Sequence, residues 1–515
     1  MDTRLRREFL RRMSTFGAAG TLGGIADAAQ GGGADSTATW PVSEAERSAA
    51  VAPVNLQFTP GDIRRYGADP TGTRDSTQAF VDANAMGNRG GGPIRIPAGK
   101  YKYAPSSRLD IAVSWLGDGA HSTFILCDTA KYSGEFFRMV SSTTLSEVLI
   151  SAVGAPKVGT GLRLAPVDAG QFTGQVRLTR VWVFGFNYNI QCDNNFEATF
   201  DQVRCESGNE GFYCAPESGE GNGYCTTHVH LNCYYGLNAR NVLYSPGMRQ
   251  AFRSITFLGG AIEGASGGSC QSSFTRCSPL KFVQIYLEAA PKIPALVLND
   301  CMASIDGAYL NGTGGIHVGA NSRVDLRHIV TTTATDVFSG GDGTQQVTMQ
   351  DCAWPASGNV LKAASLSLRN SSINGSVYRD CTPEISSLGE TRFSRQTTLV
   401  AANAAQDVYR FLDVAGEVCG GSVSGRFEII ARDKGDGSNQ AVYEYWLGSA
   451  SGGPNHASLV LLRRLVRGTD VGASADPLSL FGDGDRGGVK LQFAKTSGIS
   501  QVIVDVLFNG ITTAK

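Results

Sequence analysis

Residues 62–101 read DIRRYGADPTGTRDSTQAFVDANAMGNRGGGPIRIPAGKY and decide the fold. Asp75 and Ser76 are residue types that commonly cap the start of a helix, and Gln78 stands where a capping-box partner of Asp75 is expected. Apolar residues then recur at helical spacing, namely Ala79, Phe80, Ala83 and Met86. Glycines 90–92 end this helix, and the apolar alternation over 94–96 predicts a half-buried strand. The segment is therefore expected to cover the end of a longer β-structure.

Two spaced patterns in this stretch resemble a known superfamily. The first is YGA-x-x-x-G-x-x-D-x-T-x-A-x-x-x-A, beginning at Tyr66, and the second is GG-x-x-x-x-P-x-G-x-Y, ending at Tyr101. Both are similar to the N-terminal segment of the pectate-lyase-like superfamily, which includes tailspike-type polysaccharide depolymerases. The resemblance implies an all-β protein, a right-handed single-stranded parallel β-helix with an N-terminal capping helix. It names no substrate.

The middle of the chain repeats itself weakly. From Gly117 to Cys381, short β-branched or aromatic runs recur roughly every 22 to 28 residues, a period typical of a solenoid. Residues 176–192 superpose on residues 198–214 with a shift of 22. We therefore assign residues 54–389 to the β-helix.

The pattern changes after about residue 390. Longer alternating runs appear, such as 426–430, 442–446 and 502–506, and Gly-Asp turns separate them. Residues 390–515 are predicted to form an antiparallel β-sandwich. In tailspike-like proteins such a domain supports trimers or contacts carbohydrate, so the resemblance implies a possible homotrimer here.

The N-terminus is read as a targeting segment. Residues 5–11, LRREFLR, resemble a twin-arginine export signal, and a weakly apolar stretch and a small-x-small pattern at 26–28 follow. We expect a signal peptide at 1–29, a flexible linker at 30–53, and a periplasmic or secreted protein. The alternative is a basic disordered terminus that happens to contain two arginines.

Composition excludes some partners. The chain has 45 basic and 46 acidic residues, so its net charge of −1 gives no electrostatic reason to expect nucleic acid. No apolar run approaches the roughly 20 residues that span a bilayer, so no transmembrane segment is expected.

Twelve cysteines in an exported chain suggest disulfides, but their positions favour another interpretation. Cys192 and Cys214 end two superposable segments, so we expect stacked, buried free thiols in the solenoid core. Bridges such as Cys205 to Cys225 or Cys233 stay open alternatives.

Two glutamates are the first candidates for catalysis. Aligned repeats place Glu263, Glu288 and Asn311 in register, with Tyr286 beside them. The context resembles tailspike-type depolymerases, in which an I-E-G turn precedes an aromatic-x-E turn by one coil. Directly stacked carboxylates lie about 5 Å apart, so one can hold a proton while the other stays ionised, as glycoside hydrolysis requires. The alternative is a pair of solvated turn residues.

A second candidate cluster lies upstream. Aligned segments predict two outward ladders, Arg180, Gln202 and His230, and Trp182, Arg204 and Asn232. Asp201 flanks them, and we count it with His230, Glu263 and Glu288 among the catalytic candidates. Arginine suits a uronate carboxylate, aromatic rings stack on sugars, and histidine can take a proton during β-elimination. The same ladders are also ordinary β-helix surface.

No cofactor is expected. His228 and His230 share one strand face and could seed a zinc site, but packing or sugar contact is the preferred interpretation. Calcium is possible but not indicated, because the aspartate run of calcium-dependent pectate lyases is missing, as is the paired-aspartate and Gly-His-Gly set of polygalacturonases.

The sequence thus favours an exported enzyme that cleaves an acidic exopolysaccharide or a plant polysaccharide, with elimination slightly preferred over hydrolysis. A prophage tailspike depolymerase and a non-catalytic carbohydrate-binding surface protein remain the alternatives.

Overall fold

The computed structural model describes most of the chain from residue 39 onward. The described ranges are 39–140, 142–154, 157–168, 171–214, 225–245, 251–264, 272–290, 293–312, 314–331, 338–339, 345–354, 365–369, 371–373, 376–378, 389–400, 406–413, 422–433, 438–449, 457–468, 470–471, 478–483, 486–493 and 501–513. The predicted signal peptide, the linker residues 30–38 and Cys270, Cys381 and Cys419 lie outside these ranges.

The N-terminal cap begins with a clamp built on a buried ion pair. Helix α2 (Glu44–Ser48) carries Glu46, whose carboxylate meets Arg65 of η1 (Ile63–Tyr66) at 2.5 Å with both side chains fully buried. Arg65 also donates to the carbonyls of Trp40 and Phe58. Residues 39–53 of the predicted linker thus include Glu46 and Trp40, both of which contact Arg65 of the cap.

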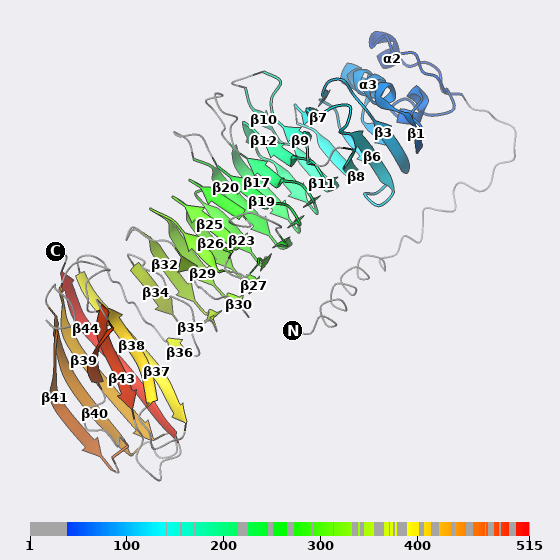
Figure 1. Ribbon diagram of the computed structural model, residues 1–515. Helices are drawn as coiled ribbons and strands as arrows, with labels where there is room; N and C mark the ends of the chain where they lie inside the picture. The colour runs from blue at the N-terminus through cyan, green and yellow to red at the C-terminus, as the bar shows by residue number, and fades with distance from the viewer. Residues whose placement is uncertain are drawn as a thin grey trace.

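Helix α3 (Thr77–Met86) closes the end of the column (Figure 1). Its Phe80 is fully buried and stacks on Trp115 at 5.5 Å, so the helix packs on the interior of the first coils. The predicted helix is confirmed, but its capping box is not formed. Ser76 is the N-cap, and Gln78 instead donates to Asp82 on the exposed face of the helix.

Behind the cap, parallel strands stack into a column (Figure 1), which confirms the predicted parallel β-helix. One sheet of 26 strands supplies two faces. The first face contains β14 (Thr199–Asp201), β17 (Cys225–Leu231), β20 (Arg253–Leu258), β23 (Leu280–Val283), β26 (Met302–Asp306), β29 (Arg323–Arg327), β32 (Gln346–Gln350) and β34 (Ser365–Arg369). The second face contains β15 (Arg204–Glu206), β18 (Tyr234–Gly236), β21 (Ala261–Glu263), β24 (Tyr286–Glu288), β27 (Tyr309–Asn311), β30 (Val330–Thr331), β33 (Ala353–Trp354) and β35 (Ser371–Ile373).

A separate sheet of ten strands forms the third face. It contains β4 (Leu109–Ile111), β7 (Glu135–Met139), β9 (Thr160–Leu164), β12 (Tyr188–Cys192), β16 (Glu210–Cys214), β19 (Arg240–Tyr244), β22 (Ser272–Thr275), β25 (Leu296–Asn299), β28 (Ile316–Val318) and β31 (Phe338–Ser339). The remaining elements of the column are η2 (Gly87–Gly91), β1 (Thr71–Asp75), β2 (Ile94–Ile96), β3 (Gly99–Tyr103), β5 (Trp115–Gly117), β6 (Thr123–Asp128), β8 (Thr144–Val153), β10 (Thr173–Gly174), β11 (Arg177–Phe184), β13 (Asn195–Phe196) and β36 (Ser376–Tyr378).

The core of the column is a set of stacked side chains. Alternate residues of each strand point inward, and the same interior position repeats from coil to coil. Phe257, for example, stacks on Phe282 of the next coil at 5.0 Å. The predicted shift of 22 is confirmed, since Trp182 pairs with Arg204.

The described cysteine side chains also lie in the core of the column. Among the described residues, the cysteines are all free and buried, which confirms the expectation of stacked core thiols for them. Cys205 is bridged to neither Cys225 nor Cys233. No helix in the described ranges is long and apolar enough to cross a bilayer.

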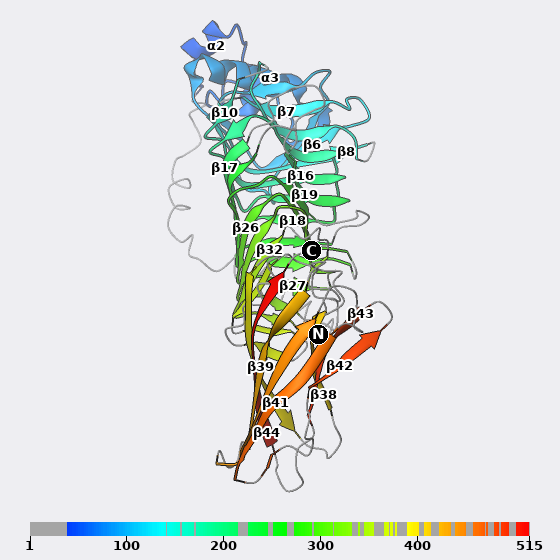
Figure 2. The same cartoon turned by 90° about the vertical axis from the view of Figure 1, so that its left-hand side faces the viewer.

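Two antiparallel sheets follow the column at its far end (Figures 1 and 2), which confirms the predicted antiparallel character of the C-terminal region. The larger sheet has the order β37 (Gly389–Val400), β44 (Gln501–Thr513), β39 (Ser422–Asp433), β40 (Gln440–Ser449) and β41 (Ala457–Arg467). The smaller has the order β38 (Gln406–Asp413), β43 (Arg486–Phe493) and β42 (Leu478–Asp483).

Candidate active site

The predicted register of the two glutamates is confirmed. Ile262 of β21 pairs with Leu287 of β24, so the next residues, Glu263 and Glu288, occupy the same position on neighbouring coils. Glu288 in turn pairs with Asn311 of β27. Neighbouring strands lie about 4.8 Å apart. Because the middle residue of each short strand is buried, both glutamates point outward, where they are half-buried.

Glu288 is held by hydrogen bonds from its own strand and the next. The Tyr286 hydroxyl donates to Oε2 of Glu288 at 2.5 Å, and Nδ2 of Asn311 lies 3.4 Å from the same oxygen. Nδ2 of Asn311 also lies 3.1 Å from the Tyr286 hydroxyl. Burial raises the pKa of Tyr286, and the hydrogen bond to Glu288 raises it further. The phenol therefore stays protonated and keeps donating to the carboxylate.

Glu263 has a tyrosine of its own from the preceding coil. Burial of Tyr234 of β18, followed by its interaction with Glu263, raises the pKa of Tyr234. Gly236 pairs with Glu263 across the two strands. A Cβ atom on Gly236 would lie 2.6 Å from the Tyr234 ring, so the glycine leaves the space that this ring occupies.

Aromatic and charged groups extend the same row toward the N-terminal end. Arg204 lies over two rings, 5.3 Å from the centroid of Trp182 and 4.4 Å from that of Tyr234, and it forms an ion pair with Glu206. On the other side, the ring of Tyr309 stacks on Tyr286 with centroids 5.7 Å apart. We call these outward residues of the second face the glutamate–tyrosine strip, defined as Trp182, Arg204, Glu206, Tyr234, Glu263, Tyr286, Glu288, Tyr309 and Asn311.

The strip thus brings together six of the predicted site residues: Trp182, Arg204, Glu263, Tyr286, Glu288 and Asn311. Three others lie elsewhere. Arg180 pairs with Glu147, Asp201 lies on the first face opposite Thr179 and Leu231, and Asn232 occupies the turn between the faces with a φ of 48°.

The predicted outward position of His230 is wrong. The register pairs His230 with Phe200, because the shift between these coils is 30 and not the 28 used in the sequence alignment. The imidazole is buried between the rings of Phe200 and Phe257, at centroid distances of 4.6 and 4.2 Å. Burial lowers its pKa well below the ordinary value, so His230 is a neutral core residue that no polymer on the surface can reach.

His228 and His230 belong to a polar chain inside the core rather than to a metal site. His228 links Asn195 Oδ1 to the Tyr244 hydroxyl at 3.0 Å on each side. The same hydroxyl is 2.8 Å from Nε2 of His230, whose Nδ1 is 2.6 Å from the Tyr235 hydroxyl. Each imidazole has one donor and one acceptor in this chain. Within the described residues no group of three or more His, Cys, Asp or Glu is placed to hold a metal ion.

Sequence reasoning missed Tyr234, although a signal was present. Tyr234, Tyr286 and Tyr309 each begin a three-residue strand of the second face, and they pair through Ala261. The recurring pattern Tyr-x-Glu or Tyr-x-Asn at Tyr286 and Tyr309 marks this row. The same misalignment by two residues that displaced His230 put Asn232 opposite Arg204, where Tyr234 belongs.

Comparisons with known proteins give a distant likeness. No protein-family model matches the chain, and no curated protein matches it. Among solved structures, tailspike protein 2 of bacteriophage CBA120, in its enzymatically active domain, is 11% identical with a TM-score of 0.48, covering 87% of this chain and 79% of that one. The tailspike of Acinetobacter phage vB_ApiP_P1 is 13% identical with a TM-score of 0.41, covering 90% and 89%. The glycan biofilm modifying enzyme WceF of Pantoea stewartii is 11% identical with a TM-score of 0.30, covering 88% and 63%.

Proposed function

We propose that the protein is a glycoside hydrolase that cleaves a polysaccharide lying along the glutamate–tyrosine strip. The observation that carries this proposal is the pair Glu263 and Glu288 on neighbouring coils, with the Tyr286 hydroxyl donating to Glu288 and Tyr234 interacting with Glu263. A linear polymer runs naturally along a row of outward side chains, and aromatic rings in that row offer stacking surfaces for sugars.

The hydrogen bonds suggest how the two carboxylates divide the work. Glu288 accepts hydrogen bonds from a hydroxyl and an amide, which fix the position of its carboxylate, so it serves as the nucleophile. Glu263 serves as the acid. A coil spacing of about 4.8 Å is close to the roughly 5 to 5.5 Å between carboxyl groups in retaining enzymes. We therefore expect retention at the anomeric carbon.

The reaction then follows two balanced steps. An oxygen of Glu288 attacks the anomeric carbon while Glu263 gives its proton to the glycosidic oxygen, which leaves with the bonding electron pair. Water then attacks the same carbon, Glu263 takes a proton from that water, and the bond to Glu288 breaks. The tyrosines hold both carboxylates in place through these changes of charge.

Hydrolysis is preferred here over the elimination favoured by the sequence. Elimination needs a group that removes a carbon-bound proton. The predicted base, His230, lies in the core, and the raised pKa values of Tyr234 and Tyr286 keep both phenols protonated. The strip contains three carboxylates but only one guanidinium, that of Arg204, which is paired with Glu206. A neutral stretch of the polymer therefore suits the glutamate pair better than a uronate.

Product chemistry tests the proposal. The purified protein is incubated with neutral and acidic exopolysaccharides, and reducing ends, ultraviolet absorbance of unsaturated uronates and the anomeric configuration by NMR are followed. New reducing ends of retained configuration without that absorbance are expected. Reducing ends accompanied by the absorbance would replace hydrolysis with elimination, and polymer binding without any new ends would favour a carbohydrate-binding protein.

We also propose that chains associate through β41, in keeping with the possible homotrimer that the resemblance implies. This strand lies at an edge of its sheet, and it exposes apolar side chains over most of its length: Val460, Leu461, Leu462, Leu465 and Val466. Trp446 on the paired strand is also exposed. An apolar, open edge strand is normally covered, and a second copy with the same edge can cover it.

Light scattering with Leu462→Lys tests this association. The wild-type protein is expected to have the mass of an oligomer and the variant that of a monomer, while Val153→Lys, at an exposed site on the column, leaves the mass unchanged. A monomeric wild-type protein would overturn it. Export through the twin-arginine pathway stays a prediction from the N-terminal residues.

A further inference from the structure

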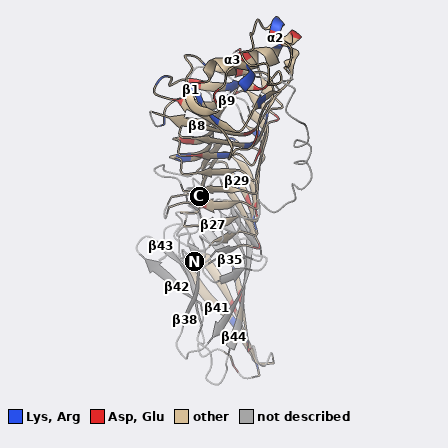
Figure 3. Ribbon diagram, turned by 90° about the vertical axis from the view of Figure 1, so that its right-hand side faces the viewer, with Lys and Arg blue, Asp and Glu red and all other residues tan. Residues whose placement is uncertain are grey.

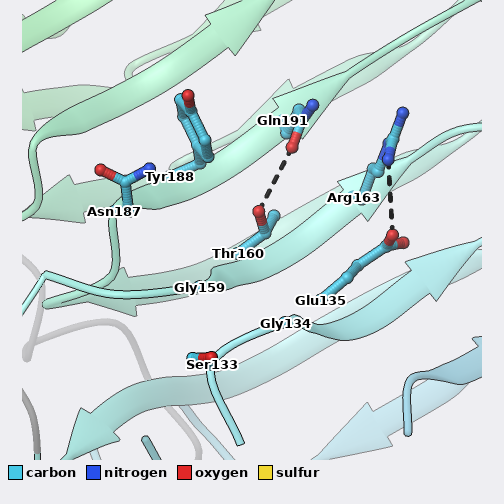
Figure 4. A pocket seen from close by; sticks show the side chains of 9 residues that line it. All are labelled: Ser133, Gly134, Glu135, Gly159, Thr160, Arg163, Asn187, Tyr188 and Gln191. Atoms are coloured by element: carbon cyan, nitrogen blue, oxygen red, sulfur yellow. Dashed lines mark hydrogen bonds and ion pairs between the residues drawn. The ribbon is translucent and has the colours of Figure 1, made fainter. Parts of the chain in front are cut away.

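The third face contains a small polar pocket, separate from the glutamate–tyrosine strip. Its volume is about 260 Å³, and it opens over the starts of β7, β9 and β12 (Figure 4). The lining side chains come from three successive coils and include Glu135, Thr160, Arg163, Tyr188 and Gln191. Ligand pockets usually measure about 300 to 1,000 Å³. This pocket therefore suits a single small ring and not an oligosaccharide.

Mutual hydrogen bonds hold the polar lining of the pocket. The Thr160 hydroxyl donates to Oε1 of Gln191 at 3.2 Å, and both residues are buried. The amide of Asn209 donates to Oδ1 of Asn187 at 2.8 Å, which orients the Asn187 amide at the rim. Side chains that are already fixed lose little conformational freedom when a ligand binds.

Charge in and around the pocket is balanced. Arg138 makes two hydrogen bonds of 2.6 Å to Glu135, and Arg163 donates to Asp193 at 2.7 Å. Arg163 also lies 3.5 Å from Glu135 (Figure 4). Two guanidinium groups thus meet two carboxylates, so the pocket offers no excess charge to an ionic ligand. Figure 3 shows the same interleaving of acidic and basic residues over the N-terminal coils.

An aromatic wall completes the pocket. Tyr188 is half-buried, and its ring packs against Tyr213 of the next coil with centroids 4.5 Å apart. The contact with Tyr213 restricts the ring of Tyr188, which lines the pocket together with Thr160 and Gln191. A stacking ring beside paired amide, hydroxyl and carboxylate groups is complementary to a pyranose, which has an apolar C–H face and a rim of hydroxyls that both donate and accept.

We propose that this pocket binds one neutral hexose unit of a polysaccharide, as an anchoring site one face away from the proposed catalytic pair. Binding of a single hexose does not depend on the proposed function; only the statement that the hexose belongs to a polysaccharide rests on it. The stacking on Tyr188, the balanced charges and the volume each select the same class of ligand. An anchor on the third face would hold the polymer to the column while another stretch lies on the second face.

Saturation-transfer NMR with monosaccharides tests the site. D-glucose, D-galactose, D-mannose and D-glucuronate are each titrated into the wild-type protein and into Tyr188→Ala, Thr160→Val and Glu288→Gln. At least one neutral hexose is expected to bind the wild type and Glu288→Gln equally, and more tightly than glucuronate does. Tyr188→Ala is expected to weaken that binding by roughly tenfold, which corresponds to about 1.4 kcal/mol.

The outcomes separate this inference from the proposed function. Hexose binding that is lost in Tyr188→Ala but kept in Glu288→Gln supports the pocket even if no polysaccharide is hydrolysed. The proposed hexose site is overturned if hexose binding needs Glu288, if glucuronate binds more tightly, or if the wild type binds no hexose. None of these results bears on hydrolysis, which the analysis of reaction products tests separately. If Tyr188→Ala fails to fold, Thr160→Val replaces it as the test, because it removes one hydroxyl from the pocket with little change of shape. Weaker hexose binding by Thr160→Val then supports the site, and unchanged binding overturns it.

Discussion

Replacing Glu46 by Gln should loosen the N-terminal cap without disturbing the column. Glu46 and Arg65 are both fully buried, and their closest atoms are 2.5 Å apart. Burial alone would raise the pKa of Glu46, but hydrogen bonds from Arg65, Ser43 and Tyr66 outweigh it and lower the pKa to about 2. The amide keeps the shape of the side chain but leaves the Arg65 charge uncompensated.

The expected cost follows from that uncompensated charge. Removing one member of a buried ion pair costs about 3 to 5 kcal/mol. Because a solenoid of this length opens in sections, a local measurement is better than a global melting curve. Amide hydrogen exchange over residues 39–66 should lose protection by roughly a hundred- to several-thousandfold, while the coils near the C-terminal end keep theirs.

A matched control lies on the same helix. Glu44 pairs with Arg47, but both side chains are exposed, at 79% and 59%. Glu44→Gln should therefore change local stability by less than about 1 kcal/mol. Equal exchange in the two variants, or unchanged protection in Glu46→Gln, would refute the idea that the buried pair fixes residues 39–53.

Three further predictions concern acid, the core and the strip. The pKa of Glu46 is lowered in the folded state, so its ionised carboxylate stabilises the cap above the unfolded pKa of about 4.3, and this stabilisation is lost as the pH falls toward 2. Pepsin should therefore begin to cut residues 39–66 between these pH values. In Glu46→Gln the cutting should begin at higher pH. His230→Phe keeps the ring stack but leaves the Tyr235 hydroxyl without its histidine partner, while the Tyr244 hydroxyl keeps its hydrogen bond to His228. Local exchange should therefore report a loss of about 1 to 3 kcal/mol, whereas the exposed His328→Gln should change it by less than about 0.5 kcal/mol. Tyr286→Phe removes the hydroxyl that donates to Glu288 and should lower kcat by roughly ten- to a hundredfold with little change in KM, whereas Tyr309→Phe should leave both nearly unchanged; similar kinetics for the two variants would contradict the positioning role.

The fold was largely predictable because its signals are local and repeated. The glycine-rich turns and the cap helix over 77–86 can be identified from short segments, and the shift of 22 between residues 176–192 and 198–214 set the register of two coils. The glutamates were also predictable, since the shift of 25 that aligns Ile262 with Leu287 could be recognised from the sequence.

The rest of the site depended on the register between coils of unequal length. The shift rises from 22 to 30 at these coils, and an error of two residues there moved His230 from the core to the surface in the sequence alignment and hid Tyr234. The clamp was missed because Glu46 lies in a segment rich in Gly, Ser and Ala, and its partner Arg65 lies 19 residues away. A buried ion pair has no periodic signal in the sequence.

Glu263 and Glu288 are proposed to act together on one glycosidic bond. The direct test measures kcat/KM for release of reducing ends by Glu263→Gln, Glu288→Gln and, as a control, Glu197→Gln, a carboxylate exposed at a turn away from the strip. Each strip variant is predicted to lose at least about a hundredfold with its fold intact by circular dichroism, and the control to retain wild-type activity. Full activity in either strip variant would contradict the account.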